Sequence, residues 1–333
     1  MINIKDPIIE FAINAVRQAA SLAGDIQGEM VSVALTKDDR SPVTVADFAA
    51  QAVVSSLLGK RFPDSILVGE EQADALRSPE GSETLDKVTN FVNRVIPGVT
   101  PELVCEYIDR GDAAPGENYW TLDPIDGTKG FLRGAQYACA LAYVEDGKVQ
   151  LGVLGCPNMN SDLRVDVGGS GLLVVAKKGS GSWMTELRES QAEVQYSPLT
   201  VSTQLEPEHA RLMRSFESGH TNVSQVDHFQ EELGGKADPV RMDSQVKYAL
   251  LAAGWGEIYL RLLSPDRMDY REKIWDQAAG SVIVEEAGGR VTDLDGNPLD
   301  FSQGRTLKKN RGICATNGIL HEAALTALRK INA

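Results

Sequence analysis

The chain has 333 residues, of which 42% are hydrophobic and 24% are charged, a balance typical of globular rather than disordered proteins. Its 33 Lys and Arg against 47 Asp and Glu leave a net charge of −14, which argues against a nucleic-acid polymer as partner. This length exceeds one minimal core and predicts either a two-lobed unit or two domains.

The four cysteines are far apart and form no CxxC pair. That spacing supports neither a zinc site nor a disulfide framework, and it fits a reducing compartment.

The N-terminal segment predicts a helix over residues 6–28 rather than a targeting peptide. Asp6 is placed as N-cap and Pro7 as the first helical residue. Apolar residues then recur at helical spacing, at Ile9, Ile13, Val16, Ala20 and Ala23. No stretch of the sequence reaches the roughly 18 apolar residues of a membrane span. We therefore expect a cytoplasmic protein that binds no membrane.

The first part of the chain predicts helices packed with an antiparallel sheet region. In chain order the predicted elements are a helix over 44–60, a strand over 65–71, a helix over 84–96, a strand over 118–124, a hairpin over 137–157 and a second hairpin over 171–184. These residues, 1–195, are predicted to form an α+β lobe.

From about residue 197 short strands alternate with helical stretches, which predicts an α/β lobe over 196–333. The strand candidates are 198–202, 240–244, 256–262, 288–294 and 312–317, and a helix is predicted over 272–289. The polar segment 185–198 is the candidate link between the lobes.

Four acidic groups could carry chemistry. They are Asp47, the pair Glu70–Glu71, the pair Asp123 and Asp126, and Asp276. Taken singly, each is more simply a helix-face acid or a solvated strand end. Taken together, carboxylates set among apolar residues are costly unless paired or bound to metal. An all-oxygen set suits Mg²⁺ or Mn²⁺ better than zinc.

A calcium loop is the competing interpretation for another acidic stretch, residues 293–300. That stretch lacks the spacing and the final glutamate of an EF-hand, so a plain hairpin turn is favoured.

The stretch DPIDGTKGF, residues 123–131, reads either as an ordinary turn or as a cation site facing an anion. A helix beginning after Gly127 would aim free backbone N–H groups at such an anion. The sequence contains no GxxxxGK[ST] and no GxSxG motif. With those two motifs excluded, the chemistry that these residues favour is metal-assisted hydrolysis of a phosphate monoester.

Three motifs in this order, VGEE, DPIDGTKGFLRG and WDQAAGSVIVEEAGG, resemble the magnesium-dependent, lithium-sensitive phosphatases of the inositol monophosphatase and fructose-1,6-bisphosphatase superfamily. The KGFLRG extension, DSQVKYALLA and IYLRL are most similar to the 3′(2′),5′-bisphosphate nucleotidases within it. The resemblance covers nearly the whole chain and implies an α-β-α-β-α sandwich with the site between the lobes.

The same resemblance implies a role for each matching residue. The implied metal ligands are Glu70, Asp123, the backbone carbonyl of Ile125, Asp126 and Asp276. Asp47 and Thr128 are implied to orient and deprotonate the attacking water, and the amides of Gly127 and Thr128 to hold the scissile phosphate.

On the substrate side, Ser244, Lys247 and Arg261 are implied to contact the nucleotide and its 5′-phosphate. His220 is implied to lie near the adenine, although His209 and His228 compete for that place and each is equally well explained as a surface histidine. Gln277 stands where relatives commonly carry histidine, and we expect it to lie behind the metal aspartate and to be tolerated.

The function implied is hydrolysis of adenosine 3′,5′-bisphosphate to AMP and phosphate, with 3′-phosphoadenylyl sulfate as a second substrate. Two or three Mg²⁺ ions are implied, with Mn²⁺ as substitute and with inhibition by Li⁺ and Na⁺. The alternatives are an inositol phosphatase of the same superfamily and a catalytically silent metal- or nucleotide-binding regulator. The implied partner is a small nucleotide bisphosphate, and a monomer is compatible with a sequence that leaves the oligomeric state open.

Overall fold

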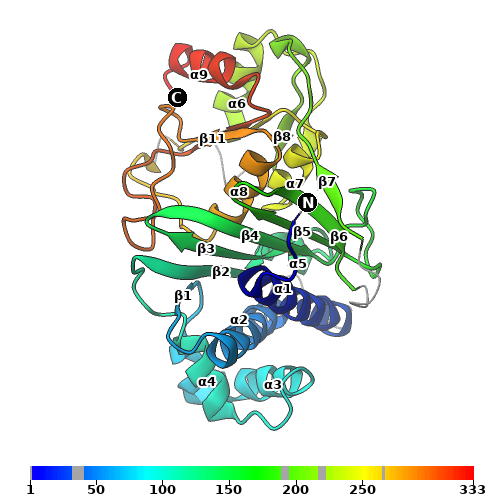
Figure 1. The fold of residues 1–333 in the computed structure, drawn as a ribbon, viewed down its shortest axis with the longest axis vertical. Helices are drawn as coiled ribbons and strands as arrows, with labels where there is room; N and C mark the ends of the chain where they lie inside the picture. Colours follow the sequence, from blue (N-terminus) through cyan, green and yellow to red (C-terminus); the bar gives the residue numbers. More distant parts are fainter. Residues whose placement is uncertain (1, 32–40, 189–194, 217–222, 265–266) are drawn as a thin grey trace.

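Five alternating layers make up the protein (Figure 1). The computed structural model describes residues 2–31, 41–188, 195–216, 223–264 and 267–333. Helices cover one face of a seven-stranded sheet, further helices separate that sheet from a five-stranded one, and outer helices close the far end. This order of layers confirms the predicted α-β-α-β-α sandwich.

The seven-stranded sheet follows the chain order from β1 to β7. Its first two strands are parallel, and each later neighbour pairs antiparallel. The strands are β1 (Ile66–Gly69), β2 (Asn118–Asp126), β3 (Ala138–Glu145), β4 (Lys148–Cys156), β5 (Leu172–Lys177), β6 (Gly181–Glu186) and β7 (Ser197–Leu199).

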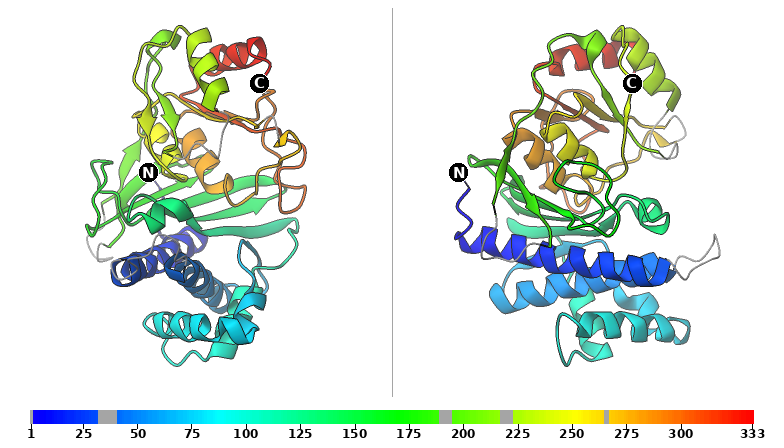
Figure 2. Two further views of the ribbon diagram at one scale, coloured as in Figure 1. Left: turned by 180° about the vertical axis from the view of Figure 1, so that it is seen from behind. Right: turned by 90° about the vertical axis from the view of Figure 1, so that its right-hand side faces the viewer.

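Helices α1 (Pro7–Ile26) and α2 (Ser41–Arg61) cover one face of this sheet (Figure 2). Asp6 caps α1 as predicted, since its carboxylate accepts hydrogen bonds from the amides of Ile8 and Ile9 at 2.9 and 3.4 Å. A π-helical turn extends α1, and two more helices pack on the outer side of α2. These elements are Gln27–Val31, α3 (Ser82–Asn93) and α4 (Pro101–Asp109).

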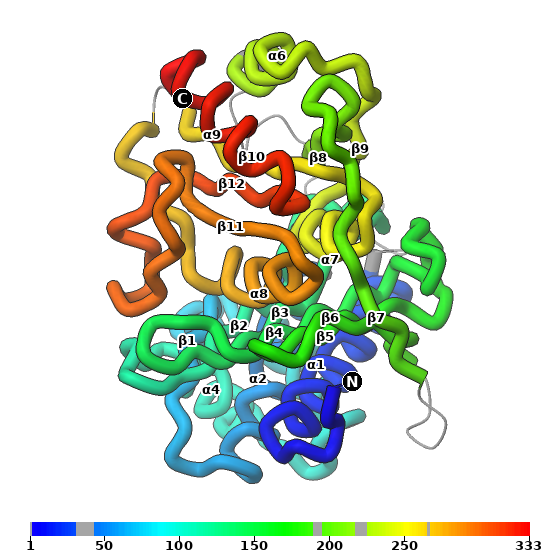
Figure 3. The backbone as a smooth tube through the Cα atoms, turned by 45° about the horizontal axis from the view of Figure 1, so that its top comes forward, coloured from blue at the N-terminus to red at the C-terminus, as the bar shows by residue number. Residues whose placement is uncertain are grey.

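Helices α7 (Val246–Ala252) and α8 (Ala278–Glu286) lie between the two sheets (Figure 3). Helix α8 contacts β4 of the first sheet and β11 and β12 of the second. Its buried residues are apolar or small on every side, as a helix enclosed by two sheets requires.

The second sheet has the strand order β11-β12-β10-β8-β9. Its strands are β8 (Leu212–Arg214), β9 (Val240–Arg241), β10 (Ile258–Arg261), β11 (Arg290–Thr292) and β12 (Ile313–Thr316). Helices α6 (Val223–Glu232) and α9 (His321–Lys330) pack together to form the outermost layer. The remaining short pieces are α5 (Thr128–Leu132) and 3₁₀ turns at Ala73–Arg77, Pro79–Gly81 and Pro207–His209.

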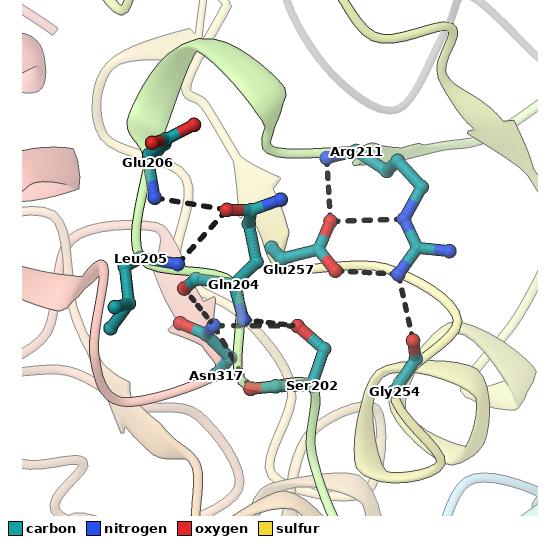
Figure 4. A network of polar contacts seen from close by, with 8 residues as sticks. All are labelled: Ser202, Gln204, Leu205, Glu206, Arg211, Gly254, Glu257 and Asn317. Carbon is teal, nitrogen blue, oxygen red and sulfur yellow. Dashed lines mark hydrogen bonds and ion pairs between the residues drawn. The ribbon is translucent and has the colours of Figure 1, made fainter.

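The chain crosses from the first sheet to the second between β7 and β8, and a polar network fixes this crossing (Figure 4). Asn317, just after β12, donates its side-chain amide to the carbonyls of Ser202 and Gln204 at 3.2 and 3.0 Å. The buried Glu257 carboxylate accepts from the backbone N–H of Arg211 at 2.7 Å and from its guanidinium at 2.6 Å. Both ends of the crossing are thereby held against the second sheet.

The predicted lobe boundary after residue 195 stays a prediction. Strand β7 belongs to the first sheet and lies just beyond that boundary. The predicted link, 185–198, includes residues 189–194, which lie outside the described part of the chain. Among the described residues, no helix combines the length and the apolar character needed to cross a bilayer.

Two of the helices differ between the prediction and the structure. The helix predicted over 272–289 begins only at Ala278, because the backbone before it pairs with another segment: Ile274 donates to the carbonyl of Arg305 at 3.2 Å. Helix α4 was not predicted, although Thr100 at its N-cap and Pro101 at its first position were local signals for it.

The acidic stretch 293–300 forms a turn. The buried Asp293 carboxylate accepts hydrogen bonds from the amides of Asp295 and Asn297 at 3.0 and 2.8 Å. Protein donors therefore satisfy this carboxylate within its own loop.

Candidate active site

Two of the predicted carboxylates come from the end of β2, where the strand contains a bulge. Asp123 pairs with Ala140 and Asp126 with Ala138, so β2 has one residue more than β3 between these pairs. In a regular strand, residues three apart face opposite sides of the sheet. The extra residue, with Pro124 lacking an N–H to donate, brings both carboxylates toward the same neighbours.

Asp123 is the centre of a group of carboxylates that repel one another. The residue is 3% exposed, and within the described part of the protein its Oδ1 has no hydrogen-bond partner. Desolvation raises the pKa of Asp123 well above its ordinary value, and repulsion by Glu70, Asp126 and Asp276 adds to the rise. A buried carboxylate in this state is costly until a proton or a cation neutralises it.

The Glu70–Glu71 pair follows β1 and is held by a glutamine of α2. Gln51 is fully buried; its side-chain amide donates to the carbonyl of Glu71 at 2.7 Å, and its Oε1 accepts from the N–H of Glu71 at 3.1 Å. Asp47 lies one turn earlier on the same helix. Gln51 thereby places Asp47 beside the glutamate pair.

The pKa values of these acids reflect that proximity. Desolvation, followed by repulsion from Glu71 and Glu70, raises the pKa of Asp47 well above its ordinary value. Glu70 keeps a solvent-exposed surface, yet enough protein surrounds it that desolvation, followed by repulsion from Glu71 and Asp126, raises its pKa to about 7.

Asp276 comes from the second lobe and lies in a turn just before α8, not within a helix as predicted. Desolvation raises the pKa of Asp276 well above its ordinary value. Repulsion by Asp126 adds to this rise, and the Arg261 charge opposes it. The structure therefore brings Asp276 to the carboxylates at the end of β2, although the two segments are far apart in the sequence.

The donor set has the chemistry of a site for a hard divalent cation, although its side chains do not form a finished cage. Carboxylate oxygens are the ligands that Mg²⁺ and Mn²⁺ prefer. As the described side chains lie, no three or more His, Cys, Asp or Glu groups are arranged to hold an ion. The carboxylates are nonetheless coupled by repulsion, and Asp123 Oδ1 is unpartnered among the described residues. The donor chemistry and this oxygen fit a cation.

A short helix, α5, begins after Gly127, as predicted. Gly127 is its N-cap and has a φ of +100°, a conformation that residues with a side chain rarely adopt. Thr128 is its first residue and is solvent-exposed. Helix α5 contacts α2, which carries Asp47, but no hydrogen bond joins these two described side chains. The water-activating pair implied by the resemblance therefore stays a prediction, and its two residues come from helices that are in contact.

The segment DSQVK, residues 243–247, packs directly on this turn. A Cβ added at Gly127 would lie 3.0 Å from the Cβ of Ser244. Ser244 has a φ of +61°, which is uncommon for a residue other than glycine and is found mostly where surrounding structure enforces it. The next residue, Gln245, donates its backbone N–H to the Asp126 carboxylate at 2.6 Å.

Lys247 is buried rather than solvated. It is 2% exposed, its ammonium donates to the hydroxyl of Ser215 at 3.1 Å, and it lies 5.2 Å from the ring centroid of Tyr259. Desolvation lowers the pKa of Lys247 to about 8, against the attraction of Asp126, which raises it. Lys247 is thus a cation held close to the carboxylate group.

Arg261, at the end of β10, is bound by both oxygens of Glu272 at 3.2 and 2.9 Å. Glu272 is 4% exposed and also accepts from the amide of Gln277 at 2.9 Å. Gln277 in turn accepts from the hydroxyl of Tyr248 at 2.5 Å. Gln277, the residue after Asp276, therefore orients Glu272, the partner of Arg261. This placement is compatible with the expected position of Gln277 behind the metal aspartate.

His220 lies outside the described residues, so its predicted place near the base stays a prediction. The two neighbouring candidates are described and exposed. His209 ends a 3₁₀ turn, with its ring 3.3 Å from the Glu206 carboxylate, and His228 lies on α6 in the outermost layer.

Sequence reasoning missed the residues that hold the carboxylates in place. Gln51, Gln245, Glu272 and Arg305 are buried or half-buried polar residues whose partners are mostly distant in the chain. Only Gln51 gave a usable signal, because a glutamine within the apolar run FAAQAVV needs a buried partner.

Comparison with known proteins gives a family for this arrangement. The family model described as the inositol monophosphatase family matches residues 4–333. The chain is 41% identical over 338 residues to the 3′(2′),5′-bisphosphate nucleotidase of Schizosaccharomyces pombe, covering 96% of this chain and 94% of that one. It is also 41% identical over 337 residues to the 3′(2′),5′-bisphosphate nucleotidase of Oryza sativa, covering 96% and 92%.

Solved structures agree at the level of the fold. The inositol monophosphatase of Anabaena (Nostoc) sp. PCC 7120 superposes with a TM-score of 0.62 at 20% identity, over 97% of this chain and 95% of that one. Mycobacterium tuberculosis SuhB superposes with a TM-score of 0.63 at 20% identity, over 98% of each chain. With the same layered fold and a family match over almost its whole length, the chain belongs to the inositol monophosphatase family.

Proposed function

We propose that the protein is a metal-dependent phosphomonoesterase that hydrolyses adenosine 3′,5′-bisphosphate to AMP and phosphate. The observation that carries the proposal is a group of mutually repelling carboxylates beside the buried Lys247 and the half-buried Arg261. Desolvation raises the pKa of Asp126, and the charges of Lys247 and Arg261 oppose that rise. Relatives named 3′(2′),5′-bisphosphate nucleotidase support the choice of substrate. 3′-Phosphoadenylyl sulfate, which carries the same 3′-phosphate, is a second candidate substrate.

The carboxylates would hold two or three Mg²⁺ ions, with Mn²⁺ as substitute. The proposed ligands are Glu70, Asp123, the carbonyl of Ile125, Asp126 and Asp276. When bound, Mg²⁺ supplies the charge that lowers the pKa of a water and stabilises a leaving oxygen.

The chain's own residues would do the rest. The Asp47 carboxylate would accept the proton of the attacking water, and the Thr128 hydroxyl would orient that water by accepting one hydrogen bond and donating another. The amides of Gly127 and Thr128 would hold the scissile phosphate. The substrate contacts proposed beyond them are Ser244, Lys247 and Arg261 for the nucleotide and its 5′-phosphate, and His220 for the base.

A panel of substrates tests this function. Phosphate release would be measured from adenosine 3′,5′-bisphosphate, 3′-AMP, 5′-AMP and inositol monophosphate, each with Mg²⁺ and with a chelator. We expect Mg²⁺-dependent release that is fastest from the bisphosphate. A preference for inositol monophosphate would instead support the second candidate, an inositol phosphatase of the same family. No turnover of any substrate would indicate a silent binding protein.

Monovalent cations should inhibit the reaction. Li⁺ is close to Mg²⁺ in size but has half its charge, so it could occupy a ligand position without stabilising the leaving oxygen. We expect the rate to fall as Li⁺ is titrated into the millimolar range, and to fall less with Na⁺. A rate unaffected by Li⁺ would contradict this site.

A cytoplasmic location and a monomeric state remain further proposals, the latter checked by size-exclusion chromatography with light scattering.

A further inference from the structure

Arg305 lies where the two lobes meet and bonds to backbone carbonyls rather than to an acid. Its guanidinium donates to the carbonyl of Gly69, the residue before Glu70, and to those of Gly111 and Ala113 at 3.2 and 3.4 Å. In the described part of the protein no carboxylate forms an ion pair with it. A half-buried guanidinium bonded only to carbonyls has lost water without forming an ion pair, and desolvation lowers the pKa of Arg305 against the weaker attraction of Asp112 and Glu70. Such a residue is better explained by the geometry it imposes than by an ion-pair contribution.

The other side of the same guanidinium faces the second lobe. Its central carbon lies 4.9 Å from the ring centroid of Trp275, the residue before Asp276. The Arg305 backbone is fixed to that segment as well, because its carbonyl accepts from the N–H of Ile274 at 3.2 Å. Two residues later, Leu307 donates its N–H to the carbonyl of Glu272 at 2.9 Å. Arg305 is therefore anchored to the strand-like stretch that leads to Asp276.

We propose that Arg305 is a positioning residue that sets the distance and orientation of Glu70 relative to Asp276. This inference rests on the proposed function, in which both carboxylates hold Mg²⁺. A guanidinium is planar and presents its donors in a rigid fork, so it can bond to several carbonyls and stack on an aromatic ring at once. Mg²⁺ demands near-ideal octahedral geometry, so a small change in the separation of two ligands from different lobes weakens its binding.

The charge of Arg305 is a separate effect. The Arg305 charge lies near the Glu70 carboxylate, and so does the charge of Lys273. Lys273 lowers the pKa of Glu70, but desolvation and repulsion by Glu71 and Asp126 raise it more. Lysine at position 305 would keep a positive charge but lose the fork. Arg305→Lys therefore separates the geometric role from simple charge compensation, and Arg305→Met removes both.

Arg17 offers a matched control. It is also half-buried, and its guanidinium also bonds to backbone carbonyls, those of Leu187 and Glu186 at 2.8 and 3.4 Å. These contacts join α1 to the end of β6, within the first lobe and on the side of the sheet opposite α8. Arg17→Lys thus makes the same chemical change without touching the segment that leads to Asp276.

The experiment measures Mg²⁺ binding to the full metal-free chain by isothermal titration calorimetry, with thermal unfolding of each variant followed by circular dichroism. Loss of a partner that orients metal ligands typically weakens metal binding roughly 10–100-fold. We expect Arg305→Lys and Arg305→Met to bind Mg²⁺ more weakly by that factor, and phosphate release by Arg305→Lys to recover at high Mg²⁺. Arg17→Lys should bind Mg²⁺ like the wild type.

Wild-type Mg²⁺ affinity in Arg305→Lys, in a chain whose wild type binds Mg²⁺ and releases phosphate, would overturn this inference and leave the proposed function standing. Equal weakening in the Arg17 and Arg305 variants would also overturn it, because general destabilisation would then explain both. A wild type that binds no Mg²⁺ would overturn the proposed function itself. If Arg305→Met fails to fold, the comparison of the two lysine variants still decides.

Discussion

Gln245 donates its backbone N–H to the carboxylate of Asp126 at 2.6 Å. Its side chain bonds to the segment that contains Asp276. It donates to the carbonyl of Trp275 at 3.0 Å and accepts from the N–H of Gly280 at 3.0 Å. One residue therefore holds the end of β2 against both sides of Asp276. The carboxylates of the two lobes meet because backbone groups, and not only the carboxylates themselves, are tied together.

Replacing Gln245 by leucine should destabilise the protein without removing a charge. The backbone bond to Asp126 would remain, but the buried N–H of Gly280 and the carbonyl of Trp275 would lose their partner, at a cost of about 1–3 kcal/mol for each unsatisfied group. Urea unfolding monitored by fluorescence measures this change. Gln245→Glu keeps one acceptor for Gly280, so its free energy of unfolding should fall less than that of Gln245→Leu near the acidic end of the pH range. An equal fall in both variants would contradict the assignment.

Stabilisation by Mg²⁺ should increase as the pH rises from about 5 to about 8. The pKa of Glu70 is raised from 4.5 to about 7 in the folded chain. Proton binding at Glu70 therefore stabilises the folded chain fully below the unfolded-state pKa of 4.5, and this stabilisation is lost as the pH rises through about 7. Mg²⁺ binds the deprotonated carboxylates and replaces the lost proton. The difference between melting temperatures with Mg²⁺ and with a chelator, measured at several pH values, checks this.

The same experiment has an internal control in Glu70→Gln. That variant cannot titrate at position 70, so the pH dependence of its Mg²⁺ stabilisation should be flatter. A wild-type difference that is constant or shrinks across this range would contradict the coupling.

Asp276→Ala should remove activity while leaving the metal-free fold at least as stable. The pKa of Asp276 is raised by desolvation and by repulsion from Asp126, so removing the carboxylate relieves an unfavourable charge. Loss of a proposed ligand should reduce kcat/KM by more than the roughly 10–100-fold typical of an outer partner. Phosphate release and the melting temperature with chelator are the two measurements. The control is Asp74→Ala, because the Asp74 side chain is 93% exposed. Near-normal turnover by Asp276→Ala would contradict the assignment of Asp276 as a metal ligand.

Arg261→Lys should reduce turnover of adenosine 3′,5′-bisphosphate and largely spare 3′-AMP, which lacks the 5′-phosphate. A charge-assisted contact remote from the reacting bond can position the substrate, and its loss should lower kcat/KM roughly 10–100-fold. Lysine is preferred to alanine because alanine would leave the buried Glu272 carboxylate without its ion partner. The measurement is kcat/KM on both substrates. An equal loss on the two would show that Arg261 supports the fold or the carboxylates rather than the 5′-phosphate.

The sequence by itself determined most of the helices and strands and the segments that carry the candidate chemistry, and the layered sandwich followed from the family resemblance. These signals are local: Asp6 and Pro7 mark the start of α1, apolar stretches predict the sheet strands, and Gly127 marks the turn that only a residue tolerating φ of +100° can make. Each depends on spacing over a few residues, which a sequence displays directly.

Only the tertiary structure decided which partners each polar group finds. Asp276 leaves the predicted helix because the stretch before it pairs with the segment at Arg305, far along the chain. Lys247, an implied substrate contact by sequence, is buried beside the Asp126 carboxylate, and Arg261 is already bound by Glu272. A buried donor or acceptor must be satisfied, but the rule does not say by which residue. That choice is made when distant segments pack, and no spacing within one segment can encode it.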